Sequence, residues 1–381
     1  MFVWTEEQRL LARTIADFAK GELASQAAEL DEKEGWNDKA FRKMADLGLL
    51  GLTVPETYGG AGLGALEASV AMEKLSEACA STTLSYLAHS ILFVHNLNMN
   101  GSEAQKKKYL PRTTSGEWIG GMGMTEPQAG SDAMGMQTKA VKKGDKYILT
   151  GTKTMITNAP TGDVFLVYAK TGSAKKEIST FIVEKTFPGF RAGKKLHKMG
   201  MRASPTGELV FDNCEVPEEN LIGSPNSSVS HMMRNLNIER ITISGISLGI
   251  AAATFAYVTK YAMERHQFGV PIGSFQMIQE RIAEMTTNLD AGRALVYAAA
   301  GACDRGEDDM SLGAKAKLFT AQMATKVALD GIQILGGWGY MKEYPVERYM
   351  RDAKLLELGA GTNEIMRMII AKEALDLKNA V

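Results

Sequence analysis

LELGAGTNEIMR, residues Leu356–Arg367, lies near the C-terminus and reads Gly-Ala-Gly at positions 359–361. No side chain larger than a methyl group occupies this point, so the stretch leaves space beside it for another molecule. Two carboxyl groups flank the small residues, Glu357 before them and Glu364 after them. The stretch therefore combines a backbone that large side chains do not cover with two nearby carboxyl groups. It is preceded by long segments in which apolar residues recur at regular intervals.

Those preceding segments are helical. Apolar residues recur at helical spacing over residues 229–267, 276–305 and 312–335, and shorter helical segments continue to Lys378. Long helices joined by short loops are typical of an antiparallel bundle. We expect a C-terminal four-helix bundle.

From about Trp118 to Leu221 the periodicity changes. Short runs rich in β-branched and aromatic residues occur at 147–149, 164–168, 180–183 and 208–211, and turn signals such as Pro188-Gly189 separate them. This pattern predicts a small antiparallel β-domain, either a barrel or a sandwich.

Helices return before Trp118. Thr5 and Gln8 form a capping-box signature ahead of a helix that we expect to reach about Leu30. Asn37 can cap a second helix. Further helices are expected at residues 65–79, 82–99 and 102–110, the last with Ser102 as its cap. The fold class is α+β and mostly α, with an N-terminal helical domain at residues 1–117, a β-domain at 118–225 and the bundle at 226–381.

Composition indicates an ordinary globular protein. The 381 residues are 45% hydrophobic and 23% charged, with a formal net charge of −1. We expect no nucleic-acid binding, since the Lys106–Lys108 run fits a solvated helix face. The three cysteines, Cys79, Cys214 and Cys303, are far apart and predict neither disulfides nor zinc, and the five histidines have no metal-ligand spacing. No signal peptide or membrane-inserted segment is expected, so the chain is not secreted.

Six local runs, taken with the domain order, resemble the acyl-CoA dehydrogenase family, and most closely its isovaleryl-CoA dehydrogenase branch. The resemblance covers essentially the whole chain. The runs are MTEPQAGSD (Met124–Asp132), TMITNAP (Thr154–Pro160), KMGMRASPT (Lys198–Thr206), RHQFG with GSFQ (Arg265–Gly269 and Gly273–Gln276), ALDGIQILGGWGY (Ala328–Tyr340) and RYMRDAKLLELGAGTNEI (Arg348–Ile365).

The stretch at 359–361 departs from most of the family in one residue. Most members carry a glutamate at the position of Ala360, and that glutamate removes the α-proton of the acyl thioester. The isovaleryl branch has alanine there and places the acid on the long helix, where this chain has Glu239 in the run LNIER. The resemblance implies that Glu239 is the base and that the Ala360 backbone N–H still binds the thioester oxygen.

Other interpretations stay open at this point. An arbitrary glutamate on a long helix is usually paired with a cation at the surface. Glu357 and Glu364 are rival carboxylates, although both recur in relatives that use the helix glutamate. The turn in MTEPQAGSD also fits a plain hairpin end whose hydroxyl groups satisfy the backbone.

The resemblance implies bound FAD and names the residues that contact it. Met155 replaces the tryptophan that covers one face of the flavin, and Trp338 replaces an asparagine after the Gly-Gly pair. The expected cofactor-binding residues are Met122, Met124, Thr125, Ser131, Met155, Ile156, Thr157, Arg265, Phe268, Gln276, Gln333, Gly336, Gly337, Thr362 and Glu364. The expected substrate-binding residues are Ser131, Ser230, Asn237, Arg240 and Gly361.

The implied activity is FAD-dependent α,β-dehydrogenation of a short branched acyl-CoA, with isovaleryl-CoA as the leading candidate. Electrons would pass to an electron-transferring flavoprotein, and the family norm is a homotetramer. One alternative is a cyclic, aryl-substituted or dicarboxylic acyl-CoA; a second is a flavin- or CoA-binding relative without dehydrogenase activity. We expect the cytoplasm if the chain is bacterial, or the mitochondrial matrix if it is a mature eukaryotic chain.

Overall fold

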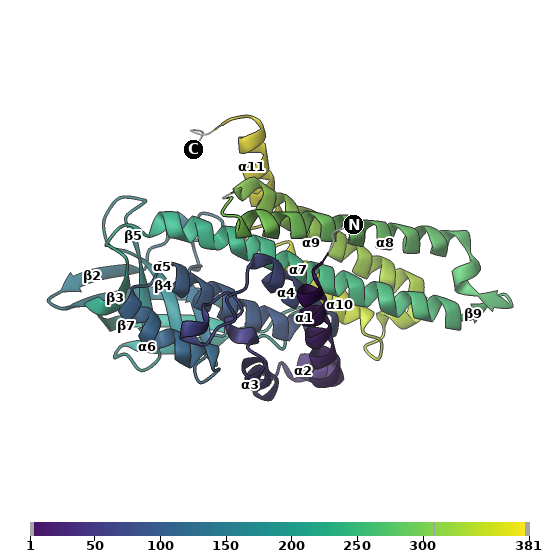
Figure 1. Cartoon of the computed structure of the whole chain (residues 1–381), viewed down its shortest axis with the longest axis horizontal. Helices are drawn as coiled ribbons and strands as arrows, with labels where there is room; N and C mark the ends of the chain where they lie inside the picture. Colours follow the sequence, from purple (N-terminus) through teal and green to yellow (C-terminus); the bar gives the residue numbers. More distant parts are fainter. Residues whose placement is uncertain (1–3, 308, 378–381) are drawn as a thin grey trace.

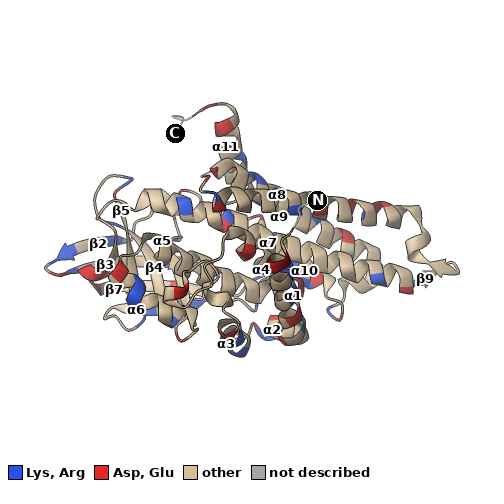
Figure 2. Cartoon of the chain, in the orientation of Figure 1, with Lys and Arg blue, Asp and Glu red and all other residues tan. Residues whose placement is uncertain are grey.

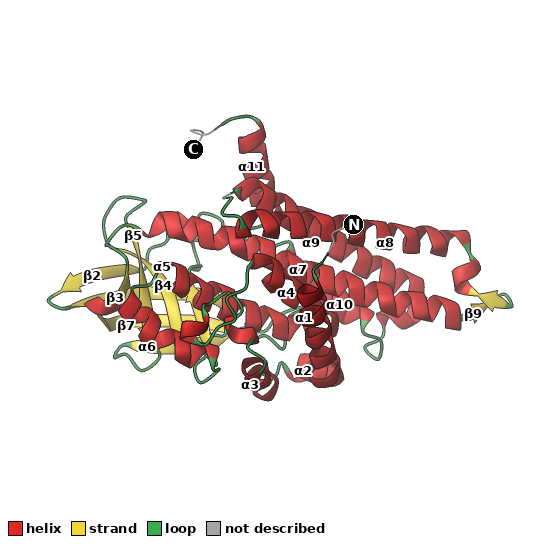
Figure 3. Cartoon of the chain, in the orientation of Figure 1, coloured by secondary structure: helices red, strands yellow, loops and turns green. Residues whose placement is uncertain are grey.

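The computed structural model describes residues 4–307 and 309–377, and Lys378 lies outside them. Helices and strands follow the predicted order of an N-terminal helical region, a β-domain and a helical bundle (Figure 3). The β-domain lies at one end of an elongated molecule, and the hairpin after the longest helix lies at the other end (Figure 1). The domain limits given above stay predictions.

The first predicted helix begins as expected and then divides. The Thr5 side chain accepts from the Gln8 backbone N–H at 3.1 Å, and the Gln8 side chain accepts from the Thr5 N–H, which confirms the capping box at the start of α1 (Glu6–Phe18). A π-helical turn at Ala19–Leu23 and a 3₁₀ turn at Ala24–Gln26 then separate α1 from α2 (Ala27–Lys33). The prediction of one helix to Leu30 was wrong at this break.

Two predicted caps are confirmed further along. The Asn37 side chain accepts from the Ala40 N–H at 3.0 Å at the start of α3 (Asp38–Asp46). Ser102 and Gln105 form a second capping box at α6 (Glu103–Thr114). Both caps satisfy backbone donors that the first helical turn leaves without partners.

The middle N-terminal helices are joined. α4 runs from Ala65 to Leu87, with a break in the backbone at Cys79, where φ is −153° and ψ is 93°. A π-helix at Ala88–His95 then leads into α5 (Asn96–Asn100). The predicted gap after residue 79 is therefore a kink within one helix.

The β-domain holds one mixed sheet in the order β6-β7-β3-β2-β4-β5-β8, with β1 paired to β4. Its hairpins are antiparallel, as predicted, whereas β1 pairs parallel with β4. Buried residues of the core strands form the apolar interior of this domain. The strands are β1 (Gly120–Gly123), β2 (Lys139–Lys143), β3 (Lys146–Thr157), β4 (Val164–Lys170), β5 (Ile178–Glu184), β6 (Phe190–Lys195), β7 (Thr206–Pro217) and β8 (Leu221–Ile222).

The C-terminal helices pack around the longest one, α7 (Ser228–Glu264). By length and composition alone, part of α7 could cross a membrane, but 72% of that window is buried within the protein. The helix is therefore the core of the bundle. The other helices are α8 (Gln276–Asp304), α9 (Met310–Leu335), α10 (Val346–Leu356) and α11 (Asn363–Ala374), and a short hairpin of β9 (His266–Gln267) and β10 (Val270–Pro271) joins α7 to α8.

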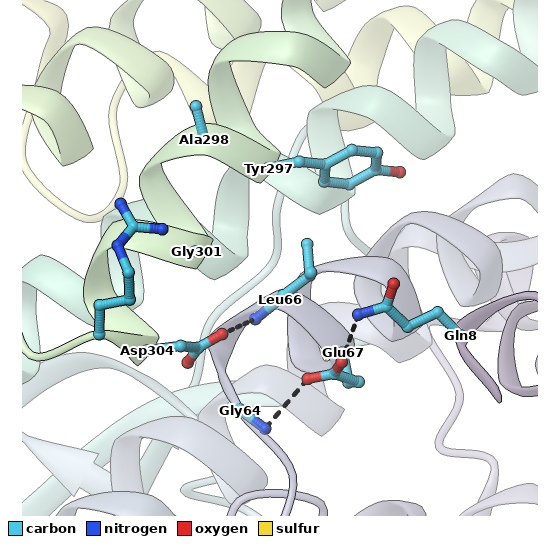
Figure 4. A pocket seen from close by; sticks show the side chains of 9 residues that line it. Gln8, Gly64, Leu66, Glu67, Tyr297, Ala298, Gly301 and Asp304 are labelled. Carbon is cyan, nitrogen blue, oxygen red and sulfur yellow. Dashed lines mark hydrogen bonds between the residues drawn. The ribbon is translucent and has the colours of Figure 1, made fainter. Parts of the chain in front are cut away.

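The N-terminal region docks onto the bundle through α4, which packs along α7. The Asp304 carboxylate at the end of α8 accepts from the backbone N–H groups of Ala65 and Leu66 at 2.5 and 3.0 Å, so it caps α4 from another domain (Figure 4). Glu67 accepts from the Gly64 N–H and the Gln8 amide beside it. A surface hollow of about 610 Å³ lies here, but its helix N-terminus is already occupied by two carboxylates.

Charged residues of both signs are interspersed over the helices and strands (Figure 2). One buried exception joins the N-terminal region to the bundle: Glu73 on α4 is fully buried and accepts from Arg293 at 2.8 Å and from the Tyr297 hydroxyl at 2.5 Å, both on α8. These contacts and the Asp304 cap fix α4 relative to α8, which packs against α7, the helix that carries Glu239.

Candidate active site

Glu239 lies on α7, one third of the way along the helix, in a segment buried from Asn237 to Ala251. Its side chain is 7% exposed and makes no hydrogen bond with the described residues. Burial raises the pKa of Glu239 from its ordinary value of 4.5 to about 7, although the charges of Arg240 and Lys317 act in the opposite direction. A carboxyl group with free lone pairs and a pKa near neutrality is suited to take up a proton.

The loop between α10 and α11 carries the Gly-Ala-Gly residues. Ala360 has φ of 54° and Gly361 has φ of 87°, so both lie in the left-handed region, which is uncommon for alanine. Within the described part of the chain, neither residue's backbone N–H makes a hydrogen bond. The loop therefore offers two adjacent backbone donors next to the apolar core against which Ala360 packs.

The rival carboxylates have surface partners. Glu357 pairs with Lys354 at 2.9 Å, and Glu364 is exposed and pairs with Arg367 at 3.3 Å. Although burial opposes it, hydrogen bonds from Thr325 and Lys354 lower the pKa of Glu357. Hydrogen bonds at the start of α11 lower the pKa of Glu364. Neither environment favours a carboxyl group that holds a proton near neutrality.

Thr362, predicted to contact the cofactor, has a clear local role. Its hydroxyl accepts from the Ile365 N–H at 3.4 Å and caps α11. The cap ends the left-handed loop and starts the helix at a fixed residue, which sets the direction in which the N–H groups of Ala360 and Gly361 point.

The residues around Glu239 on α7 leave polar atoms without partners. Arg240 is 4% exposed, and its Nε and Nη1 have no hydrogen-bond acceptor among the described residues; Asn235 Oδ1 and Asn237 Oδ1 likewise have no donor. The two asparagines line a cavity of about 530 Å³ between α7 and the loop around Leu63. Buried polar groups normally have partners, so these atoms indicate a ligand that supplies them. Ser230, the other predicted substrate residue of α7, is exposed and does not line this cavity.

One group of predicted cofactor residues lies in the β-domain. The Thr125 carbonyl accepts from the Thr154 N–H at 2.9 Å, which holds the segment after β1 against β3. Met155 has φ of 58°, lies at a break in the β3–β7 register and is 69% exposed, whereas Ile156 is buried. The bulge turns the methionine side chain out of the sheet, as a residue that covers a ligand requires.

Four other predicted residues of this domain differ in exposure. Met122 lies on β1, and its sulfur accepts from the Asn235 amide at 3.7 Å, so it meets α7 directly. Met124 is buried and Ser131 is exposed. Thr157 is the last residue of β3 and is partly buried.

A second group lies at the far end of the bundle. Arg265, Gly336 and Gly337 line a cavity of about 490 Å³; the exposed Gln333 precedes its lining residue Ile334 on α9, and the exposed Gln276 is the first residue of α8. Phe268 is 94% exposed with φ of 53°. Arg265 follows Glu239 by 26 residues, which is roughly 39 Å along a helix axis.

The single chain therefore does not bring the two groups of predicted cofactor residues together (Figure 1). The β-domain group lies near Met122 and α7, and the Arg265 group lies at the opposite end of the molecule. An extended dinucleotide does not reach from one to the other.

Known proteins resemble the chain over almost its whole length. Models of the acyl-CoA dehydrogenase N-terminal, middle and C-terminal domains match residues 5–117, 121–214 and 229–375. The chain belongs to the acyl-CoA dehydrogenase family. The mitochondrial isovaleryl-CoA dehydrogenase of Pongo abelii is 46% identical over 374 residues, which are 97% of this chain and 88% of that protein.

Solved structures show the same acyl-CoA dehydrogenase architecture. The glutaryl-coenzyme A dehydrogenase in a complex with glutaryl-CoA is 37% identical, has a TM-score of 0.97 and covers 100% of this chain and 98% of its own. PigA in a complex with FAD is 30% identical, has a TM-score of 0.95 and covers 100% of both chains. The family and the fold predicted from the sequence are confirmed.

Two buried lysines were missed by sequence reasoning. Lys153 on β3 is fully buried; its ammonium donates to the Met124 carbonyl at 3.0 Å and to Glu126 at 2.7 Å, and so braces the segment that carries Thr125. Lys317 on α9 is 1% exposed and donates to the Gly361 carbonyl at 2.7 Å. The sequence could have indicated the burial of Lys153 and Lys317, because each lysine occupies a position of a strand or helix where apolar or small residues are expected.

Proposed function

We propose that this acyl-CoA dehydrogenase oxidises a short branched acyl-CoA, with isovaleryl-CoA as the leading candidate, to its 2,3-enoyl-CoA. The observation that carries the proposal is the buried Glu239 carboxyl group, which has no hydrogen-bond partner among the described residues and a pKa of about 7. It takes the α-proton of the thioester, while the loop N–H groups at Ala360 and Gly361 stabilise the oxygen that gains negative charge.

Bound FAD supplies the acceptor for the hydride from the β-carbon. The exposed Met155 on its bulge and the Thr125 segment fit the flavin end of this cofactor, and Arg265 with the open Gly336–Gly337 backbone fits its phosphates. The methionine in place of tryptophan fills the same space with a more flexible, polarizable side chain.

Anaerobic reduction of the bound flavin tests the substrate. We expect isovaleryl-CoA to bleach the flavin absorbance faster than straight-chain, cyclic or aryl-substituted thioesters at equal concentration. Rapid bleaching by a larger thioester with none by isovaleryl-CoA would replace our candidate. Absence of bleaching by every thioester, in protein that retains FAD, would support the non-dehydrogenase alternative.

A dicarboxylic acyl-CoA is the second candidate, because one observation favours it. Arg240 is buried beside the proposed base, and two of its guanidinium nitrogens have no acceptor within the described residues. A second carboxylate on the acyl chain would satisfy them. Glutaryl-CoA therefore belongs in the panel; faster bleaching by glutaryl-CoA than by isovaleryl-CoA, lost in Arg240→Met, would select this candidate.

We further propose a homotetramer in which each cofactor site is shared between two copies. The two groups of FAD residues are too far apart within one chain, and the far end of the bundle exposes large apolar side chains that a second copy would cover. These are Met263, Phe268, Met277, Trp338, Tyr340 and Met341. Electrons leave to an electron-transferring flavoprotein, and we expect the bacterial cytoplasm or the mitochondrial matrix as the compartment.

Co-expression of two inactive variants tests the shared site. One copy carries Glu239→Gln and its partner carries Arg265→Ala, with different affinity tags for purification of the mixed oligomer. Where two copies share each site, a mixed pair contains one site with both native residues and regains activity. No regain in mixed oligomers that contain FAD would place both residues in the same chain's site.

A further inference from the structure

Lys317 is a buried cation at the centre of the bundle. It lies on α9, which packs against α7, α8, α10 and α11, and its side chain is 1% exposed. An ammonium group at such a place destabilises the folded protein unless neighbours stabilise the charge. Its Nζ donates to the Gly361 carbonyl at 2.7 Å and to Asn363 Oδ1 at 3.3 Å. Gly361 belongs to the loop that carries Ala360, and Asn363 is the first residue of α11, which follows that loop.

The loop needs such support because its backbone is strained. Ala360 holds φ of 54°, and a non-glycine residue is strained in this region, so it persists only where surrounding contacts fix it. The Asn363 N–H donates to the Glu357 carbonyl at 2.9 Å and closes the loop on one side. On the other side of the loop, Lys317 donates to the carbonyl of Gly361, the residue after Ala360.

Lys317 also faces Glu239 electrostatically. Burial lowers the pKa of Lys317 from 10.5 to about 8, and the negative charge of Glu239 acts against this shift; the positive charge of Lys317 in turn favours the ionised form of Glu239. The other charged groups that face this pair are Arg240 on α7, Glu357 at the end of α10 and Glu364 on α11. Burial raises the pKa of Tyr168 on β4, and the negative charge of Glu239 also contributes to this rise. Lys317 is therefore the one cation of α9, within the described residues, that acts on both the loop and the proposed base.

We propose that Lys317 is a positioning residue of the active site: it fixes the Gly361 carbonyl and thereby the loop backbone that carries the Ala360 N–H one residue earlier, while its charge stabilises the carboxylate form of Glu239. The inference rests on the proposed function, since it assigns the N–H and the carboxylate their roles. Lys317 itself touches neither reacting carbon. A loss of the ammonium should impair oxyanion binding and proton abstraction together.

Two variants of the FAD-loaded enzyme separate these effects. Lys317→Met keeps the stem without the charge, and Lys317→Arg keeps a charge with a different donor geometry. The matched control is Lys326→Met on the same helix, where the lysine pairs with Glu284 and Asp330 at the surface. For each protein, flavin bleaching by the best thioester is followed from pH 5.5 to 9.

We expect Lys317→Met to lower the maximal bleaching rate about 10-fold or more, as the loss of a fixed donor does. Its acid limb should move to higher pH, since burial of Glu239 is then less compensated. Lys317→Arg should lower the rate but keep the acid limb of the wild type, and Lys326→Met should match the wild type in both. An equal loss at every pH without displacement of the acid limb would show a structural role alone and overturn the proposal.

A double-mutant cycle tests the electrostatic interaction between Lys317 and Glu239 without turnover. Thermal midpoints are measured at pH 7.5, between the pKa of about 7 of Glu239 and the pKa of about 8 of Lys317, for the wild type, Lys317→Met, Glu239→Gln and the double variant. We expect Lys317→Met to lower the midpoint more when Glu239 is present than when glutamine replaces it. Additive shifts would refute the Lys317–Glu239 interaction, whatever the substrate. If the wild type shows no bleaching but the effects of the two substitutions on the thermal midpoint are not additive, the proposed function is rejected and the Lys317–Glu239 interaction is supported.

Discussion

Replacement of Glu239 with glutamine separates the catalytic role of this carboxyl group from its effect on stability. Glutamine keeps the shape of the side chain but does not titrate. Burial, opposed by the charges of Arg240 and Lys317, raises the pKa of Glu239 from 4.5 to about 7 in the folded protein. Each unit of difference between the folded and unfolded pKa corresponds to about 1.4 kcal/mol.

The sign of the stability effect follows from this direction. Because the folded pKa is raised, the wild type binds the proton of Glu239 more tightly than the unfolded chain does, and it loses stability as pH rises from 4.5 through 7. Well above pH 7, the ionised Glu239 carboxylate lowers the free energy of unfolding by about 3 kcal/mol per chain, relative to a glutamate whose pKa does not change on folding. Between pH 5.5 and 8.5 the advantage of Glu239→Gln over the wild type should therefore grow by about 2 kcal/mol.

The effect on catalysis has the opposite sign. Glutamine cannot accept the α-proton, and loss of a general base lowers rates by about 10²- to 10⁴-fold. The bound FAD should be unaffected, because no predicted cofactor contact is changed. A functional group that destabilises its own fold is expected at an active site.

The assay has two arms on the same preparations. Urea unfolding at pH 5.5, 7 and 8.5 compares the wild type with Glu239→Gln, and anaerobic flavin bleaching compares their activity. Glu357→Gln, which removes the rival acid of the loop, is the control and should keep bleaching within a few-fold. A stability difference that does not change with pH, or rapid bleaching by Glu239→Gln with loss in Glu357→Gln, would refute the assignment of the base.

Three further changes have expected outcomes. Met155→Trp should slow FAD release by about 2- to 10-fold through aromatic stacking, measured by flavin fluorescence, and unchanged release would argue against a flavin contact at this bulge. Lys153→Met leaves the Glu126 carboxylate buried without its cation and should lower the free energy of unfolding by about 3 to 5 kcal/mol; the same change in a Glu126→Gln background should cost less, or the ion pair does not stabilise this segment. Asp304→Ala removes the cap of α4 and should lower the free energy of unfolding by about 1 to 2 kcal/mol, with Asp304→Asn intermediate; wild-type stability of Asp304→Ala would show that water replaces the cap.

The sequence predicted best those features that depend on neighbouring residues. The capping boxes at Thr5 and Ser102 involve side chains and N–H groups three residues apart, so their residue types are sufficient. The π-helical turn after Phe18 and the kink at Cys79 were not predictable in this way. Both depend on packing between helices, which does not alter the apolar periodicity along each one.

The parallel pairing of β1 with β4 was also outside local prediction. β1 is a run of four residues, Gly120–Gly123, with three glycines and little β-propensity. It joins the sheet because its backbone is held between β4 and the helix that carries His89, whose ring accepts from the Gly120 N–H. A strand with so few side chains is defined by its partners, and these are distant in sequence.

Lys317 shows why part of the site escaped the sequence. In GAKAKLFTA, residues 313–321, two lysines alternate with small residues, and such a pattern usually marks a solvated helix face. The structure buries Gly313, Ala316, Lys317 and Thr320 on one side of α9, so the lysine lies in the stripe that faces the core. In the sequence, the burial of Lys317 is indicated only by its spacing of four residues from Gly313 and three residues from Thr320, which lie on the same side of the helix. A buried ammonium group is destabilising without acceptors, so this spacing could be interpreted only once the Gly361 carbonyl was found beside Lys317. Through Lys317, the loop that carries Ala360 is linked electrostatically to Glu239 on the long helix.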